Sequence, residues 1–281
     1  MNLRERNKAR RLQRQRLRQA RRNRRLQPLM EPLERRQLLS GSPAEIVLYD
    51  SIVYDSQGFE SPAFVAGDLT GQDATGQATA LGPWVRDGAE GSATVQTTVA
   101  LGGSQAVQVD RVAGSEDRWG MTTLAPRAPY DAVLVEWDMR VDAQTAVAGT
   151  YGPFMGVEAY DTNATFALLG ALYVDATTGD LITLDSNSFA TETGYQATLG
   201  TWHHYEIQLD FTNVTYTVLQ DDIQVDSRPF VDLGVATITS FTDAAIAAIQ
   251  GAAGSTADSL EATAYVDNYV VTEIYSGFTG D

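Results

Sequence analysis

The sequence predicts an all-β fold, a sandwich of two antiparallel sheets. Apolar residues recur at alternate positions from Ala44 onward, the segments between them are short and rich in Gly, Asp, Asn, Ser and Pro, and no helical segments alternate with the strands. The chain also shows no internal repeat of fixed period, which argues against a propeller or a solenoid. We expect the sandwich to span residues 47–275, between a leader and linker at 1–46 and a C-terminal tail at 276–281.

Charge divides the chain into a basic N-terminal segment and an acidic body. Of the 20 Lys and Arg residues, 14 lie in residues 1–40, which leaves 6 for the body; of the 36 Asp and Glu residues, 3 lie there, which leaves 33. The body therefore carries a net charge of −27. Such a surface repels phosphate backbones, so we expect no nucleic acid partner for the body.

The chain of 281 residues contains no cysteine, and 43% of its residues are hydrophobic. Disulfides, thiolate chemistry and cysteine-based zinc sites are therefore excluded, and stability has to come from one large core. No apolar run reaches the roughly 18 residues that a membrane-spanning helix needs, so the sequence predicts no membrane span.

The N-terminal segment from Arg4 to Arg25 consists almost wholly of Arg, Gln and Asn. It has no apolar face to bury, so we expect it to be disordered or only transiently helical. A solvated basic tail and an arm that binds nucleic acid both fit this composition. An ordinary secretory signal fits poorly, because no apolar stretch follows the basic one.

Residues 31–40, EPLERRQLLS, resemble the LEPR-XLL leader, an N-terminal element of large exported or surface proteins of some environmental bacteria. The basic stretch before them and the small residues Ser40-Gly41-Ser42 after them match that pattern, whereas the order Pro32-Leu33-Glu34-Arg35 departs from it. The resemblance implies export, and with it an extracellular or cell-surface location.

Several segments of the body alternate as half-buried strands do. Val133–Asp142 is the clearest, with an apolar face that includes Trp137 and an opposite face that carries charge. Trp202–Phe211 follows the same pattern, and Ala262–Glu273 is rich in β-branched and aromatic residues. Asp243–Gln250 is rich in alanine, but eight residues are marginal for a helix, and we expect a buried strand.

Short turns connect neighbouring strands. Gly102-Gly103 supplies the positive φ angles of a tight hairpin between residues 93–100 and 105–111. Residues 175–180 (DATTGD) turn residues 166–174 back along 181–185, and Asp221-Asp222 joins residues 214–219 to 223–226. We therefore expect antiparallel neighbours at all three turns.

Three groups of segments, taken in order, resemble the concanavalin A-like jelly roll, which includes laminin G-type modules. The first is GFE at 58–60, GDLTGQ at 67–72 and Trp84. The second is WHHYEIQLD at 202–210, YTV at 216–218 and the Asp221-Asp222 turn, and the third is AYVDNYVV at 264–271. The resemblance covers nearly all of residues 47–275 and implies two curved sheets with one concave face.

The resemblance also implies a structural Ca²⁺ where the first and last strands meet. Glu60 and Asp267 match the positions that supply its oxygen ligands, and hard oxygen ligands are what Ca²⁺ requires. The alternative is that both are ordinary surface carboxylates among the 33 of the body.

Hydrolases of this fold carry Glu-x-Asp-x-x-Glu, or a one-residue variant, on one strand. Residues 136–142 (EWDMRVD) begin this pattern, but Arg140 and Val141 stand where the closing Glu should be. Lyases of the fold need clustered His, Tyr, Arg and Gln or Asn, whereas the two histidines, His203 and His204, are adjacent and should point to opposite faces. No Gly-x-Ser-x-Gly elbow occurs either. We therefore expect no catalytic centre.

Aromatic side chains near glycine-rich segments are candidate platforms for a sugar. Trp84, Trp137 and Trp202 have alternating apolar neighbours and are expected in the core. The candidate ligand-binding residues are Trp119, Tyr151, Phe154, Tyr160 and Tyr195, with Phe189 in similar surroundings.

The sequence favours a non-catalytic, exported module that binds a glycan or a surface protein. Two alternatives stay open, an atypical glycoside hydrolase or polysaccharide lyase of the same fold, and a purely structural or adhesive surface protein. Fold alone does not choose among them, because relatives include lectins, carbohydrate-binding modules, adhesion modules and enzymes. The sequence does not name the ligand or the oligomeric state.

Overall fold

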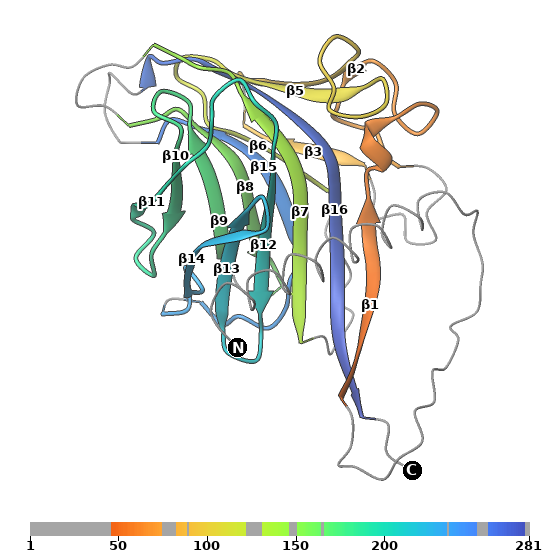
Figure 1. The fold of residues 1–281 in the computed structure, drawn as a ribbon, viewed down its shortest axis with the longest axis vertical. Coiled ribbons are helices and arrows are strands. Elements are labelled where there is room, and N and C mark those ends of the chain that lie inside the picture. Colours follow the sequence, from red (N-terminus) through yellow and green to blue (C-terminus); the bar gives the residue numbers. More distant parts are fainter. Residues whose placement is uncertain are drawn as a thin grey trace, which may run out of the picture. The chain divides into compact units, whose positions relative to one another are not determined.

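The computed structural model describes residues 46–74, 83–88, 90–121, 131–145, 151–163, 166–234, 236–251 and 258–278. Strands form two antiparallel sheets in these ranges, which confirms the predicted all-β jelly-roll sandwich (Figure 1). The predicted leader, with its LEPR-XLL-like residues, lies outside the described ranges. Within them, no helix is long and apolar enough to cross a membrane.

The larger sheet has nine strands. Its order is β14 (Ile223–Pro229), β13 (Thr215–Gln220), β12 (His203–Asp210), β7 (Ala132–Val141), β16 (Ala262–Phe278), β5 (Ala106–Arg111), β4 (Ser92–Gln96) and β2 (Gly67–Asp68), and β1 (Ile46–Asp55) also pairs with β16.

The smaller sheet has seven strands, in the order β11 (Ala190–Gln196), β10 (Asp180–Leu184), β9 (Ala167–Asp175), β8 (Phe154–Asp161), β15 (Asp243–Ile249), β6 (Asp117–Met121) and β3 (Trp84–Asp87). A single 3₁₀ turn, η1 (Gln57–Phe59), follows β1.

The first and last strands of the sandwich run side by side (Figure 1). Their register places Ile46 opposite Phe278 and Asp55 opposite Val270. Strand β16 therefore continues past residue 275, where the sequence predicted a tail to begin. The reason is pairing: β1 supplies main-chain partners for residues 276–278.

The core lies between the sheets and follows the predicted alternation. On β7 the side chains of Val133, Val135, Trp137, Met139 and Val141 are buried, and Trp137 stacks on Tyr205 of β12 with ring centroids 5.7 Å apart. Trp84 is also buried, as predicted. Trp202 is only half-buried, because it stands before the first residue of β12 and has no strand face to hold it inward.

Two of the predicted turns are confirmed, and the third differs. Asp221 and Asp222 have φ angles of 51° and 66° between β13 and β14, and residues 176–179 join β9 to β10. Strand β4 ends at Gln96, however, because the Gln96 side chain accepts hydrogen bonds from the N–H groups of Thr98 and Val99. A loop of residues 97–105 therefore replaces the tight hairpin predicted at Gly102-Gly103.

The substitution Trp137→Ala should destabilise the fold by about 3–5 kcal/mol, because it removes a large aromatic side chain from the centre of the core. Chemical denaturation followed by circular dichroism measures this change. Arg140→Ala, on the outer face of the same strand, is the control and should cost less than about 1 kcal/mol. Similar losses for both variants would contradict the assignment of faces on β7.

Candidate functional site

A groove of about 760 Å³ lies on the face of the seven-stranded sheet that points away from the core. Its floor comes from β6, β8, β9, β10 and β15, which are neighbours in the sheet. Phe154, Tyr173, Leu184 and Ile249 supply apolar surface, and the chain segment before β11 forms part of the rim.

Alternation along β8 sends side chains to both faces of this sheet. Every residue of β8 is buried: Met155 and Val157 face the core, whereas Glu158 and Tyr160 line the groove. Gly156 allows β9 to approach closely, since a Cβ atom there would lie 2.0 Å from the carbonyl oxygen of Leu172. The strand thus places a carboxylate and a phenol on the groove floor.

Four polar side chains form one cluster on that floor, Arg118, Glu158, Tyr160 and Tyr173. The hydroxyl groups of Tyr160 and Tyr173 both donate to the Glu158 carboxylate. Arg118 Nε donates to Glu158 Oε2 at 2.5 Å and to the Tyr160 hydroxyl oxygen at 3.1 Å, and Arg118 Nη2 donates to Glu158 Oε1 at 3.1 Å. The Glu158 carboxylate is therefore the centre of the cluster.

Burial controls the protonation of the two phenols. It raises the pKa of Tyr160 and of Tyr173 well above the ordinary value, and the adjacent Glu158 charge raises both further. Burial alone would lower the pKa of Arg118, but the Glu158 carboxylate overrides it and raises that pKa. At neutral pH the groove floor therefore presents protonated hydroxyl groups and a guanidinium.

Two phenylalanine rings stand at the edge of the groove with most of their surface exposed. Phe166 and Phe189 each expose 67% of their surface, although both line the groove. The Phe166 ring packs near Tyr160, with centroids 4.9 Å apart. Exposed aromatic rings beside polar groups in a concavity are typical of ligand sites.

The charged side chains that line the groove are mostly acidic. Three of the described lining residues are acidic, Asp87, Glu158 and Asp232, and one is basic, Arg118. Their net charge is therefore −2. Asp232 also has a structural role, because its Oδ2 accepts the N–H of Leu168 at 2.7 Å. The groove therefore offers little attraction to an anion.

Asp243, the first residue of β15, is a carboxylate beside this cluster in the sheet. It pairs in register with Tyr160 of β8, and a Cβ atom on Gly120 would lie 2.4 Å from its Oδ2. Burial raises the pKa of Asp243 to about 7, against the opposing effect of hydrogen bonds from the N–H groups of Met121 and Ala244. Its charge therefore changes close to neutral pH.

The sequence-predicted ligand residues divide into three groups. Phe154 and Tyr160 line the groove, and their role as ligand platforms stays a prediction. Tyr151 and Tyr195 are exposed, at 49% and 44%, but neither is among the lining residues. Trp119 is wholly buried in the core, so its prediction as a ligand platform is wrong; alternation on β6 turns Trp119 inward and its neighbour Arg118 outward.

Arg118, Glu158, Tyr173 and Phe166 line the groove although the sequence did not indicate them as site residues. One signal was present, because Glu158 is a charged residue that directly follows the apolar residues 154–157 of β8. Tyr173 carries no comparable local signal, since only the pairing of β9 with β8 brings it to the groove, and Phe166 is recognised only by its contact with Tyr160.

The residues weighed for catalysis lie elsewhere. Glu136 and Asp138 are on the outer face of β7, in the other sheet, where Asp138 Oδ1 lies 3.0 Å from His204 Nδ1. His203 packs against Tyr205 with ring centroids 6.2 Å apart, and its Nδ1 lies 2.8 Å from Asp221 Oδ2. Residues 136–142, which begin like the hydrolase motif, therefore do not line the groove.

Glu60 and Asp267, the predicted calcium ligands, both contact the loop of residues 101–105. Asp267 Oδ2 accepts the N–H groups of Leu101 and Gly102 at 3.1 and 3.2 Å, and Glu60 Oε1 accepts that of Ser104 at 2.6 Å. A Cβ atom on Gly58 would lie within 4 Å of both side chains.

This donor set fits a cation that prefers oxygen ligands. Asp267 is fully buried, and burial raises its pKa to about 6, a cost that a bound cation would relieve. The side-chain oxygen of Gln105, whose N–H group bonds to Glu60, is also buried and has no hydrogen-bond partner among the described residues. Calcium at this seam stays a prediction.

No family model matches the chain, and no curated protein matches it. Solved structures resemble it only distantly. "Cellulose induced protein, Cip1" is 15% identical with a TM-score of 0.48 over 70% of this chain and 93% of its own. An endo-beta-1,4-glucuronan lyase from the fungus Trichoderma reesei is 9% identical with a TM-score of 0.48, over 74% and 94% of the two chains. The alginate lyase Aly36B is 11% identical with a TM-score of 0.47, over 79% and 96%. Likenesses at this level carry no inference about activity.

The substitution Asp243→Asn should raise stability at pH 8 relative to the native chain. The folded-state pKa of Asp243 is about 7, above its unfolded value, so the native chain loses stability as pH rises from about 4 to 7. The substituted side chain does not titrate in this range. The difference in free energy of unfolding between the variant and the native chain should therefore reach about a few kcal/mol at pH 8. Thermal unfolding between pH 4 and pH 8 measures it; a difference that is constant with pH would contradict the assigned pKa.

Calcium should raise the melting temperature of the native chain relative to EDTA, since a ligand that binds only the folded state stabilises it. A hundredfold excess over Kd corresponds to about 2.7 kcal/mol. Asp267→Asn should remove most of this increment, whereas Asp210→Asn, outside the seam, should keep it. Identical melting curves of the native chain in both buffers would leave Glu60 and Asp267 as clamps for the 101–105 loop alone.

Proposed function

We propose that the groove on the seven-stranded sheet binds a neutral glycan chain, and that the protein is an exported, non-catalytic binding module. The observation that carries this proposal is the pair of exposed rings, Phe166 and Phe189, at the edge of a floor that presents hydroxyl, guanidinium and carboxylate groups.

Sugars combine apolar C–H faces with hydroxyl groups, and the groove offers a partner for each. The C–H face of a sugar ring can stack on Phe166 or Phe189, which would remove apolar surface of both partners from water. Sugar hydroxyl groups can exchange hydrogen bonds with the edges of the Arg118 and Glu158 cluster. Because Glu158 holds the cluster together without a ligand, the polar groups are already oriented when a sugar arrives.

Charge favours a neutral glycan over a polyuronate. The side chains that line the groove have a net charge of −2, and the body has a net charge of −27. A chain of carboxylates would therefore be repelled both locally and at long range. Arg118 is the one lining residue that could neutralise a sugar carboxylate, and two hydrogen bonds already commit it to Glu158.

Binding is better supported than cleavage. The Glu158 carboxylate accepts hydrogen bonds from two phenols and a guanidinium, which hold it in place as an acceptor rather than leaving it to attack or to protonate a glycosidic bond. A lyase would need to neutralise a uronate, and the groove charge opposes that substrate. The two histidines of the chain, His203 and His204, belong to β12 of the nine-stranded sheet and lie away from the groove.

The double variant Phe166→Ala/Phe189→Ala should weaken glycan binding at least tenfold, because it removes both stacking surfaces. A glycan array of neutral and acidic polysaccharides identifies the ligand, and isothermal titration calorimetry measures the affinity. Tyr265→Ala, which removes a partly exposed ring from the other sheet, is the matched control and should bind as the native chain does.

Three outcomes would contradict the proposal. Binding of uronate chains in preference to neutral ones would refute the argument from charge. Equal affinity of the native chain and the double variant would place the ligand elsewhere. Shorter products of a bound polysaccharide, seen by size-exclusion chromatography, would make the groove an active site.

A further inference from the structure

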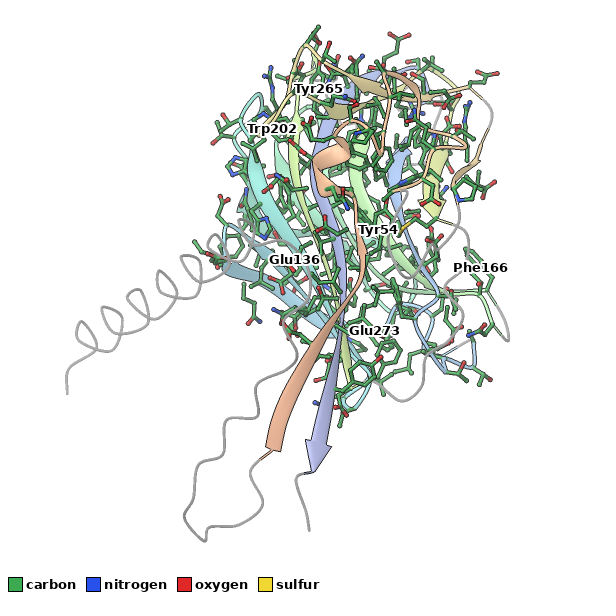
Figure 2. All side chains as sticks on the ribbon, turned by 90° about the vertical axis from the view of Figure 1, so that its right-hand side faces the viewer. Tyr54, Glu136, Phe166, Trp202, Tyr265 and Glu273 are labelled. Carbon is green, nitrogen blue, oxygen red and sulfur yellow. The ribbon has the colours of Figure 1, made fainter. Side chains whose placement is uncertain are left out.

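Three potential metal ligands meet on the outer face of the nine-stranded sheet, Glu136 of β7 and His204 and Glu206 of β12. They face outward because Trp137 and Tyr205, their neighbours along the two strands, are buried in the core. Figure 2 shows Glu136 and Phe166 on opposite sides of the sandwich, so this cluster is separate from the groove.

We propose that Glu136, His204 and Glu206 bind a divalent transition-metal ion of the Zn²⁺ type. One ligand atom from each residue lies within 4.8 Å of the other two. Zn²⁺ binds nitrogen and carboxylate oxygen at about 2.0–2.2 Å, which places tetrahedral ligand atoms about 3.4 Å apart. The proposal requires the glutamate side chains to rotate so that the ligand atoms close the remaining distance.

The gap between His204 and Glu136 has the size that an intervening ion requires. His204 Nε2 lies 3.8 Å from Glu136 Oε1, which is too far for a hydrogen bond and close to the spacing of two ligands on one metal ion. The strand register adds Glu206 to the pair, because Glu206 lies directly opposite Glu136 in the ladder of β7 and β12.

Residues behind the cluster orient the imidazole. His204 Nδ1 lies 3.0 Å from Asp138 Oδ1, and the other oxygen of Asp138 accepts a hydrogen bond from Asn268 Nδ2 at 2.8 Å. With its proton on Nδ1 and directed at Asp138, His204 presents the lone pair of Nε2 toward Glu136. A carboxylate that fixes a histidine in this way is the usual support of a metal-bound imidazole.

Electrostatics gives the bound ion a further role. Carboxylates directly opposite each other on adjacent strands repel, and Glu136 and Glu206 occupy such positions in a body of charge −27. A divalent cation between them turns this repulsion into attraction. The nitrogen ligand distinguishes this site from the calcium seam at Glu60 and Asp267, whose donors are all oxygen, because imidazole suits Zn²⁺ and its neighbours rather than Ca²⁺.

Titration calorimetry of the full, EDTA-treated chain with Zn²⁺ tests the proposal, in millimolar Ca²⁺ to occupy sites with oxygen ligands only. We expect one Zn²⁺ per chain, weakened at least tenfold by His204→Asn. Asp138→Asn keeps all three ligands and should weaken binding roughly 10–100-fold. His203→Asn changes the only other histidine, which contacts Asp221 instead, and should leave the affinity unchanged.

Co²⁺ provides a second readout, because its visible absorption changes when protein ligands replace the six waters of the aqueous ion. The native chain and His203→Asn should give the same protein-bound spectrum, and His204→Asn should lose it. Far-UV circular dichroism and thermal unfolding establish that each variant is folded. Zn²⁺ affinity that is unchanged by His204→Asn, or the spectrum of aqueous Co²⁺ in the native chain, would refute the site.

Discussion

Strand β16 holds the nine-stranded sheet together, because its main chain pairs with three other strands. It pairs with β7 over residues 264–274, with β5 over residues 262–266 and with β1 over residues 270–278. The core on this side of the sandwich depends on that pairing, since Val266, Tyr269 and Val271 point inward from β16. The Tyr269 hydroxyl group also donates to the carbonyl of Ala244 on β15 at 2.9 Å, so the strand connects the two sheets.

The bulge in β16 serves two features of the molecule at once. Its register against β7 shifts between Asp267 and Val270, and Asn268 adopts a φ angle of 51°, which asparagine tolerates better than most residues. The bulge directs Asp267 to the 101–105 loop, while the Asn268 side chain reaches Asp138 on the outer face. Two consecutive residues of one strand therefore serve different sites, Asp267 the predicted calcium seam and Asn268 the support of the proposed transition-metal site.

Alternation along the chain predicts the strands well, because side chains on a strand have a period of two and the core accepts only one face. The assignments for β7 and β12 rest on this pattern, as does the placement of Trp84 and Trp137, whereas β16 was predicted from its β-branched and aromatic residues and β15 from its short length. Alternation does not reveal which face of a short strand points to the core, and for this reason the pattern around β6 does not show that Trp119 is buried and Arg118 lines the groove.

The groove could not be predicted, because its members come from strands that the sequence does not place side by side. Glu158 and Arg118 are far apart in the chain and meet only because β15 lies between β8 and β6 in the sheet. Phe166 lines the groove from the position just before β9, although the sequence predicted it as the first residue of that strand. The length of the 97–105 loop was missed for a similar reason, since the side chain of Gln96 ends β4 and two distant carboxylates hold the loop.

The pairing of β1 with β16 also determines how the sandwich would respond to mechanical force. Ile46 and Phe278 lie opposite each other, so a pull on the chain at both ends would open the β1–β16 ladder one residue pair at a time, like a zipper. A pull of this kind breaks the hydrogen bonds between β1 and β16 one after another. If the two strands were instead pulled along their length, all of these hydrogen bonds would bear the force at the same time. A chain tethered at both ends would therefore release the outer part of β1 first and expose the edge of β16 there, and the opening would meet resistance at Val53 and Tyr54, which are buried in the core.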